Sequence, residues 1–130
     1  MFHTFCSQEE RKNFGGSDFL EMQFCRMPPN TEIERMVAAD RIKHWCQDSL
    51  YISGDDAGVF FQEYDGIFDC GICSNSETGA IDPYGINYYR ADLMDAIIAK
   101  ILKKRPADYE TLTAWLYTAK THHGFYILGV

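Results

Sequence analysis

The feature that most constrains this chain is a pair of helical patterns separated by a proline in its last third. Apolar residues recur at helical spacing over residues 93–102 and form a wide stripe that must be buried. Pro106 ends this helix, because proline cannot continue it, and can begin the next. A second apolar face, over residues 109–119, predicts another helix, and Gly124 is a suitable residue to cap its end. The continuous apolar run Phe125–Leu128 predicts a buried strand.

Earlier segments change to the two-residue period of strands. Residues 18–25 alternate apolar and polar side chains, and residues 50–52 form a short apolar run. The pair Asp65-Gly66 is a hairpin signal between residues 59–64 and 67–73, so we expect an antiparallel meander of about three strands there. A polar loop is expected to follow over residues 74–84.

A third helix is expected after Pro28-Pro29. Thr31 and Glu34 have the spacing of a capping box, which predicts a helix that runs to about Asp48. The predicted fold class is therefore α+β, with an antiparallel β-meander packed against about three helices. The chain has 130 residues, of which 46% are hydrophobic, so residues 1–130 can bury one core and form a single domain.

The sequence composition also indicates the cellular compartment of the protein. The N-terminal residues resemble no secretory signal, and no apolar run is long enough to span a bilayer. An odd number of cysteines, five, indicates reduced thiols rather than a disulfide framework. We expect a cytoplasmic protein with no membrane contact.

Charge is distributed very unevenly along the chain. The formal net charge is −7, yet residues 45–89 contain no Lys, Arg or His and hold eight acids, so the rest of the chain is close to neutral. Concentrated negative potential attracts basic proteins and repels nucleic acid. A solvated face that aids solubility is the alternative explanation.

We therefore predict a partner-binding surface in this segment. It consists of the eight acids and one tyrosine beside them: Asp48, Asp55, Asp56, Glu63, Asp65, Asp69, Glu77, Asp82 and Tyr84. Tyrosines are favoured anchors at interfaces, and Tyr84, Tyr88 and Tyr89 are equally compatible with an ordinary core.

Motifs for catalysis, metals or cofactors are absent or incomplete in the sequence. Cys70-Gly71-Ile72-Cys73 is a CxxC, but no second ligand pair accompanies it as in a zinc site, and it follows a predicted hairpin rather than opening a helix as in redox proteins. The acids do not follow calcium-loop spacing. His122-His123 suits a helix end better than acid–base chemistry. We expect no enzyme activity, cofactor or metal, and the alternative is a small redox or zinc protein that uses Cys70 and Cys73.

The C-terminal third resembles bacterial immunity proteins, which neutralise polymorphic toxins, including those of contact-dependent growth inhibition. The resemblance rests on the helix over residues 93–102, on Pro106-Ala107-Asp108-Tyr109, on Trp115-Leu116 and on residues 124–129. It implies a small acidic binder that occludes a basic toxin domain, often a nuclease. It assigns no role to any single residue.

Overall fold

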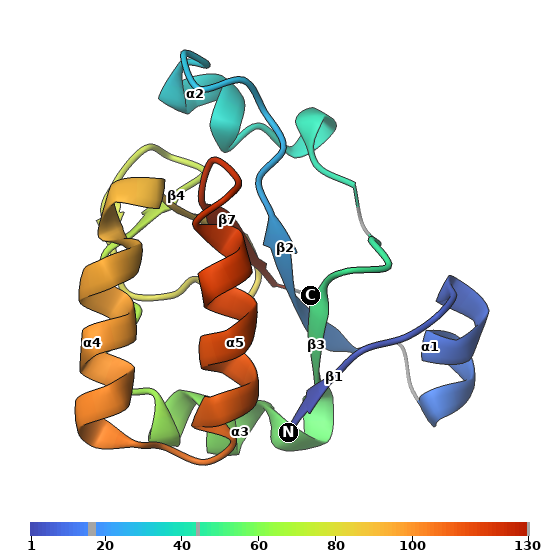
Figure 1. Cartoon of the computed structure of the whole chain (residues 1–130). Helices are drawn as coiled ribbons and strands as arrows, with labels where there is room; N and C mark the ends of the chain where they lie inside the picture. The colour runs from blue at the N-terminus through green and yellow to red at the C-terminus, as the bar shows by residue number, and fades with distance from the viewer. Residues whose placement is uncertain (16–17, 44, 130) are drawn as a thin grey trace.

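The computed structural model describes residues 1–15, 18–43 and 45–129, and in this part of the chain seven strands form one antiparallel sheet (Figure 1). From one edge to the other the strands are β1 (Phe2–His3), β3 (Leu50–Ser53), β2 (Phe19–Phe24), β7 (Phe125–Leu128), β6 (Ile86–Tyr89), β4 (Gly71–Cys73) and β5 (Thr78–Gly79). The register of β2 and β7 runs from Glu21 opposite Leu128 to Phe24 opposite Phe125. Strands from the first and last fifths of the sequence thus form the centre of the sheet.

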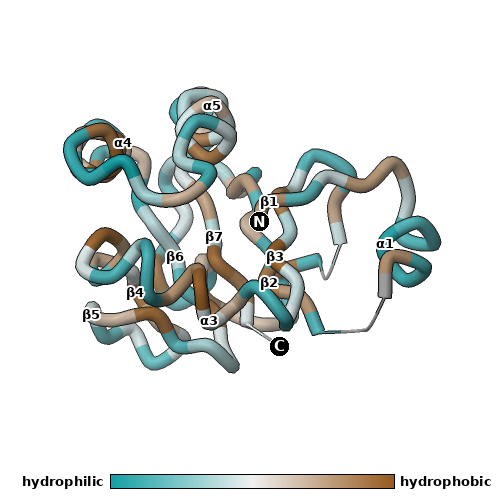
Figure 2. The backbone as a smooth tube through the Cα atoms, turned by 90° about the horizontal axis from the view of Figure 1, so that it is seen from below, coloured by the Kyte–Doolittle hydropathy of each residue, from teal (hydrophilic) through white to brown (hydrophobic). Residues whose placement is uncertain are grey.

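Three helices cover one face of this sheet. Helices α4 (Met94–Lys104) and α5 (Tyr109–Ala119) lie side by side, and α3 (Gly54–Glu63) lies at their lower ends (Figure 1). The Tyr64 hydroxyl, just after α3, donates a hydrogen bond of 2.6 Å to the carbonyl of Ala107 between α4 and α5. In the view from below, α4 and α5 lie on one side of the strands, and α1 (Gln8–Gly15) stands apart from β4 and β5 (Figure 2).

The other face of the sheet is covered by an irregular segment. It contains the four-residue helix α2 (Ile33–Met36) and the 3-10 turn η1 (Ala39–Arg41), and a second 3-10 turn, η2 (Ala91–Leu93), precedes α4. Met36 and Val37 pack on this face against Tyr88 and Tyr126. Both faces of the central strands are therefore covered, and all six residues of β2 are buried.

The α+β class and the strongest sequence patterns are confirmed. Strand β2 occupies the predicted residues 18–25, β3 the run at residues 50–52, and β7 the run Phe125–Leu128. Helices α4 and α5 occupy the two predicted C-terminal patterns, with α5 beginning at Tyr109 rather than at Pro106. The described residues form five α-helices, two more than the predicted number of about three.

The meander was predicted wrongly in its first half. Residues 59–64, predicted as a strand, belong to α3 and the turn that ends it. Two acids in the first turn, Asp55 and Asp56, complement the helix dipole, and Phe60 and Tyr64 lie four residues apart on the buried side. Asp65-Gly66 is the turn after this helix and not a hairpin, and only Gly71–Cys73 of residues 67–73 is a strand.

Two further local predictions were wrong. The helix expected from Thr31 to about Asp48 is reduced to α2 and η1, and no side chain caps α2 at Glu32; residue 44 lies outside the described residues. Gly124 does not cap α5, which ends at Ala119; it follows the turn over residues 120–123 and directly precedes β7, with φ at +85°. No sequence pattern predicted β1, β5, β6 or α1.

Two glycines give a test of this fold. A Cβ atom at Gly124 would lie 2.0 Å from the Tyr89 carbonyl oxygen, and its positive φ disfavours any other residue. We expect Gly124→Ala to lower the free energy of unfolding by about 2–3 kcal/mol, measured by urea denaturation.

Gly58→Ala is the matched control for that substitution. Gly58 lies in α3, and nothing is within 4 Å of a Cβ atom placed there. Alanine should raise the free energy of unfolding by about 0.5–1 kcal/mol, because it favours a helix more than glycine does. A loss of stability in Gly58→Ala would contradict the helical assignment of α3.

Candidate functional site

Strand direction decides which of the predicted partner-binding acids lie near one another. Because neighbouring strands are antiparallel, β3 and β4 end where β2 and β6 begin. Asp55 and Asp56 follow β3, Glu77 closes the turn between β4 and β5, and Asp82 precedes β6. These four acids and Tyr84 lie at one end of the sheet, which we call the acidic end.

One further acid joins this end and was missed from the sequence. Asp18 precedes β2, and its backbone carbonyl accepts a hydrogen bond of 2.7 Å from the N–H of Gly54 at the start of α3. Asp18 lies outside the segment that lacks basic residues, so the charge pattern along the chain did not mark it. One imidazole lies nearby, since Nε2 of His3 is 3.8 Å from Oδ2 of Asp56.

The other four predicted acids lie elsewhere. Asp48 and Asp69 precede β3 and β4 at the opposite end of the sheet, and Asp48 forms an ion pair with Arg26. Glu63 is engaged at the end of α3, where Oε1 accepts a bond of 3.0 Å from the Ala107 N–H. Asp65 lies in the turn after α3, and its carbonyl is 3.3 Å from Nζ of Lys104.

Tyr84 is the exposed aromatic side chain of the acidic end. Its side chain is 81% accessible, whereas Tyr88 and Tyr89 are core residues. Asp82 fixes the turn below it, since Oδ1 accepts a bond of 3.0 Å from the Tyr84 N–H. The backbone N–H and carbonyl of Asp82 are held by the side-chain amide of buried Asn87, at 2.8 and 2.9 Å. The loop therefore presents Tyr84 from a constrained backbone.

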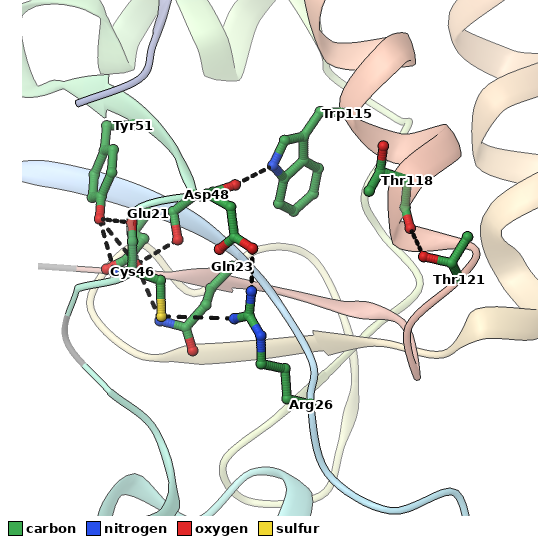
Figure 3. Close-up of polar contacts among 10 residues, drawn as sticks. Glu21, Gln23, Arg26, Cys46, Asp48, Tyr51, Trp115, Thr118 and Thr121 are labelled. Atoms are coloured by element: carbon green, nitrogen blue, oxygen red, sulfur yellow. Dashed lines mark hydrogen bonds and ion pairs between the residues drawn. The ribbon is translucent and has the colours of Figure 1, made fainter. Parts of the chain in front are cut away.

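A second polar cluster lies inside the molecule, centred on Glu21 of β2 (Figure 3). Its side chain is only 4% accessible, and Oε2 accepts hydrogen bonds from Ser49 Oγ at 2.7 Å, Gln23 Nε2 at 3.0 Å and the Tyr51 hydroxyl at 3.3 Å. Burial and the nearby Glu21 charge raise the pKa of Tyr51, which keeps its hydroxyl protonated as a donor. An alternating pattern is typical of a strand with one solvated face, but in β2 the polar residues Glu21 and Gln23 are buried as well.

A groove of about 690 Å³ lies beside this cluster, at the end of the sheet opposite the acidic end. It opens between the end of β2 and residues 41–43 and 45–48. Its described lining includes three cationic residues, Arg26, Arg41 and Lys43, one acid, Asp48, and the indole of Trp45. The Trp45 Nε1 has no hydrogen-bond partner among the described residues.

The CxxC thiols have separate neighbours. Cys70 packs against the main core, while Sγ of Cys73 is 3.6 Å from Oδ1 of Asn87. Burial raises the pKa of both thiols, because the thiolate loses solvation. The motif stands at the start of β4 and not at a helix N-terminus, so the geometry lacks the feature that activates redox cysteines.

The two residues of the histidine pair also contact different parts of the structure. His122 stacks on Phe24 with ring centroids 4.6 Å apart, and the N–H of His123 donates a bond of 3.1 Å to the Cys25 carbonyl. Within the described part of the chain, no three His, Cys, Asp or Glu side chains group as metal ligands. Nor do the described residues include a helix long and apolar enough to cross a bilayer.

Comparison of this chain with protein-family models, curated proteins and solved structures gives no match.

The Glu21 cluster predicts a specific loss of stability. Glu21→Gln keeps the shape of the side chain but replaces one acceptor oxygen with an N–H₂ group that faces donors. We expect the free energy of unfolding to fall by about 1–3 kcal/mol in urea denaturation. Glu9→Gln, at an exposed position of α1, should change it by less than about 0.5 kcal/mol, and equal effects of the two substitutions would contradict the role of the cluster.

Thiol reactivity tests the environment of the CxxC. Cys6 is the exposed cysteine, and Cys25, Cys46, Cys70 and Cys73 all have a raised pKa, which lowers their thiolate fraction at any given pH. Ellman's reagent at pH 8 should therefore react rapidly with one thiol per chain, and Cys6→Ser should remove that phase. If two thiols per chain react rapidly and Cys70→Ser removes this rapid phase, the assignment to Cys6 is wrong and the redox alternative is favoured.

Proposed function

We propose that this protein is an immunity-type inhibitor that binds a basic toxin domain through the acidic end of its sheet and thereby neutralises the toxin. The observation that carries the proposal is that Asp55, Asp56, Glu77 and Asp82 lie at the same end of the sheet as the exposed Tyr84. The net charge of −7 supports a basic partner and disfavours nucleic acid as the ligand.

Each component of this end has a separate role in binding. Acids that face solvent raise the rate of encounter with a basic protein and select its orientation. Tyr84 offers a large side chain with two rotatable bonds, so its ordering on binding costs little entropy. The constrained backbone at Asp82 reduces that cost further, because the loop does not have to be ordered by the partner.

The resemblance of the C-terminal third to immunity proteins supports the class of function. The segments that carry it form α4, α5 and β7, which build the core and the centre of the sheet rather than the acidic end. In such a protein the scaffold is separate from the surface that recognises the toxin. Neutralisation then follows from occlusion: the acids pair with Lys and Arg side chains that line the toxin's cleft, and substrate is excluded.

Charge reversal at the acidic end tests this proposal. The chain is expressed with the product of the gene immediately upstream of its own, and complex formation, association rate and protection of growth are measured. Asp55→Lys/Asp56→Lys should lower the association rate about tenfold at low salt and reduce protection, because steering depends on the local potential.

The control is a double reversal of equal charge at a distance from the acidic end. Glu34→Lys/Asp40→Lys changes exposed acids of α2 and η1 and should leave the association rate within about twofold of the parent. If the first variant associates and protects as well as the parent at low salt, binding through the acidic end is wrong. If the upstream product forms no complex with the parent chain, the inhibitor function itself is wrong.

A further inference from the structure

The groove beside the Glu21 cluster has a wall that is fixed by buried hydrogen bonds. Gln23 Nε2 donates a hydrogen bond of 2.8 Å to the backbone carbonyl of Lys43. The Tyr51 hydroxyl donates a hydrogen bond of 2.8 Å to the carbonyl of Cys46. Trp115 Nε1 donates a hydrogen bond of 2.9 Å to the carbonyl of Asp48. Figure 3 shows Tyr51 of β3 beside Cys46 and Trp115 of α5 beside Asp48. A cavity held in this way exists before a ligand arrives, so little binding energy is lost in ordering it.

Glu21 is the positioning residue of that wall. Its Oε2 accepts one N–H of the Gln23 amide, and the same amide nitrogen reaches Lys43. Glu21 itself is not part of the lining, because Gln23 stands between its carboxylate and the groove. The buried acid therefore holds the wall in place without direct contact with a bound molecule.

The lining combines an apolar floor with a cationic rim. The apolar side chains are Phe24, Met27, Ile42, Trp45 and Tyr126. Arg26 is neutralised by Asp48, the single acid of the described lining, and this leaves the exposed Arg41 and Lys43 as the uncompensated charges of the groove. This local excess of positive charge lies in a chain of net charge −7.

We infer that this groove binds a small organic anion with an apolar body. Its volume lies in the range of sites for small molecules, which are mostly apolar with a few polar groups that fix orientation. The apolar body packs on Phe24, Trp45 and Tyr126, and a sulfonate, carboxylate or phosphate group meets Arg41 and Lys43. The site lies at the opposite end of the sheet from the acidic end, so the inference is independent of the proposed inhibitor function.

The probe for this site is 8-anilinonaphthalene-1-sulfonate, an aromatic anion whose fluorescence rises in apolar surroundings. The two tryptophans of the chain both adjoin the groove: Trp45 lines it, and Trp115 stacks on Phe24 with ring centroids 4.2 Å apart. Binding in the groove should therefore give one site per chain with efficient energy transfer from tryptophan to the probe. A near-UV circular dichroism spectrum that persists at saturation shows that the probe binds the native fold.

Charge-neutral variants identify the groups that hold the anion. Arg41→Gln/Lys43→Gln should weaken binding of the sulfonate at least about fivefold. Lys100→Gln/Lys103→Gln removes two exposed charges from α4 and should leave the affinity within about twofold. The uncharged analogue N-phenyl-1-naphthylamine should bind the parent and the Arg41/Lys43 variant equally, since it has no group for the rim to hold.

Three results would overturn the inference. The first is the absence of a single saturable site on the native protein. The second is equal weakening of sulfonate binding by the two double variants, which would indicate a general effect of net charge. The third is a loss of affinity for the uncharged analogue as large as that for the sulfonate, which would indicate that the Arg41/Lys43 substitutions distort the groove.

Discussion

Burial of both faces of β2 is the constraint on which the rest of this structure depends. Helices α3, α4 and α5 cover one face, and the segment between β2 and β3 packs on the other, so every residue of the strand is buried. Two of its residues, Glu21 and Gln23, are polar, and a buried carboxylate or amide without partners would be strongly destabilising. The hydrogen bonds that meet this requirement tie β2 to Ser49, Tyr51 and Lys43.

The elements predicted correctly are those whose local sequence pattern indicates the structure without knowledge of contacts to distant residues. Helix α4 has a wide apolar stripe followed by a left-handed residue and a proline, and β7 is a continuous apolar run. In both elements the spacing of the apolar residues alone indicates that the element is buried. In α3, by contrast, Phe60, Phe61 and Tyr64 suggested a strand because aromatic residues favour strands, whereas contact with the α4–α5 connection stabilises a helix there.

The candidate sites were harder to foresee because they depend on topology. The charge pattern grouped Asp55, Asp56, Glu77 and Asp82 with Asp48 and Asp69, and only the directions of the strands separate these two sets and bring in Asp18. The groove has no linear signature at all. It depends on Gln23 meeting Lys43 and on Trp115 meeting Asp48, contacts across 20 and 67 positions of the sequence.

The central place of β7 in the sheet has a consequence for the order in which the chain is synthesised. Until residues 125–128 leave the ribosome, β1, β3 and β2 can form only one half of the sheet, and β6, β4 and β5 only the other. Each half would then expose the unpaired backbone edge that β7 later covers, and such edges are templates for aggregation. Insertion of β7 between β2 and β6 therefore removes both edges at once and protects the sheet from pairing with another chain.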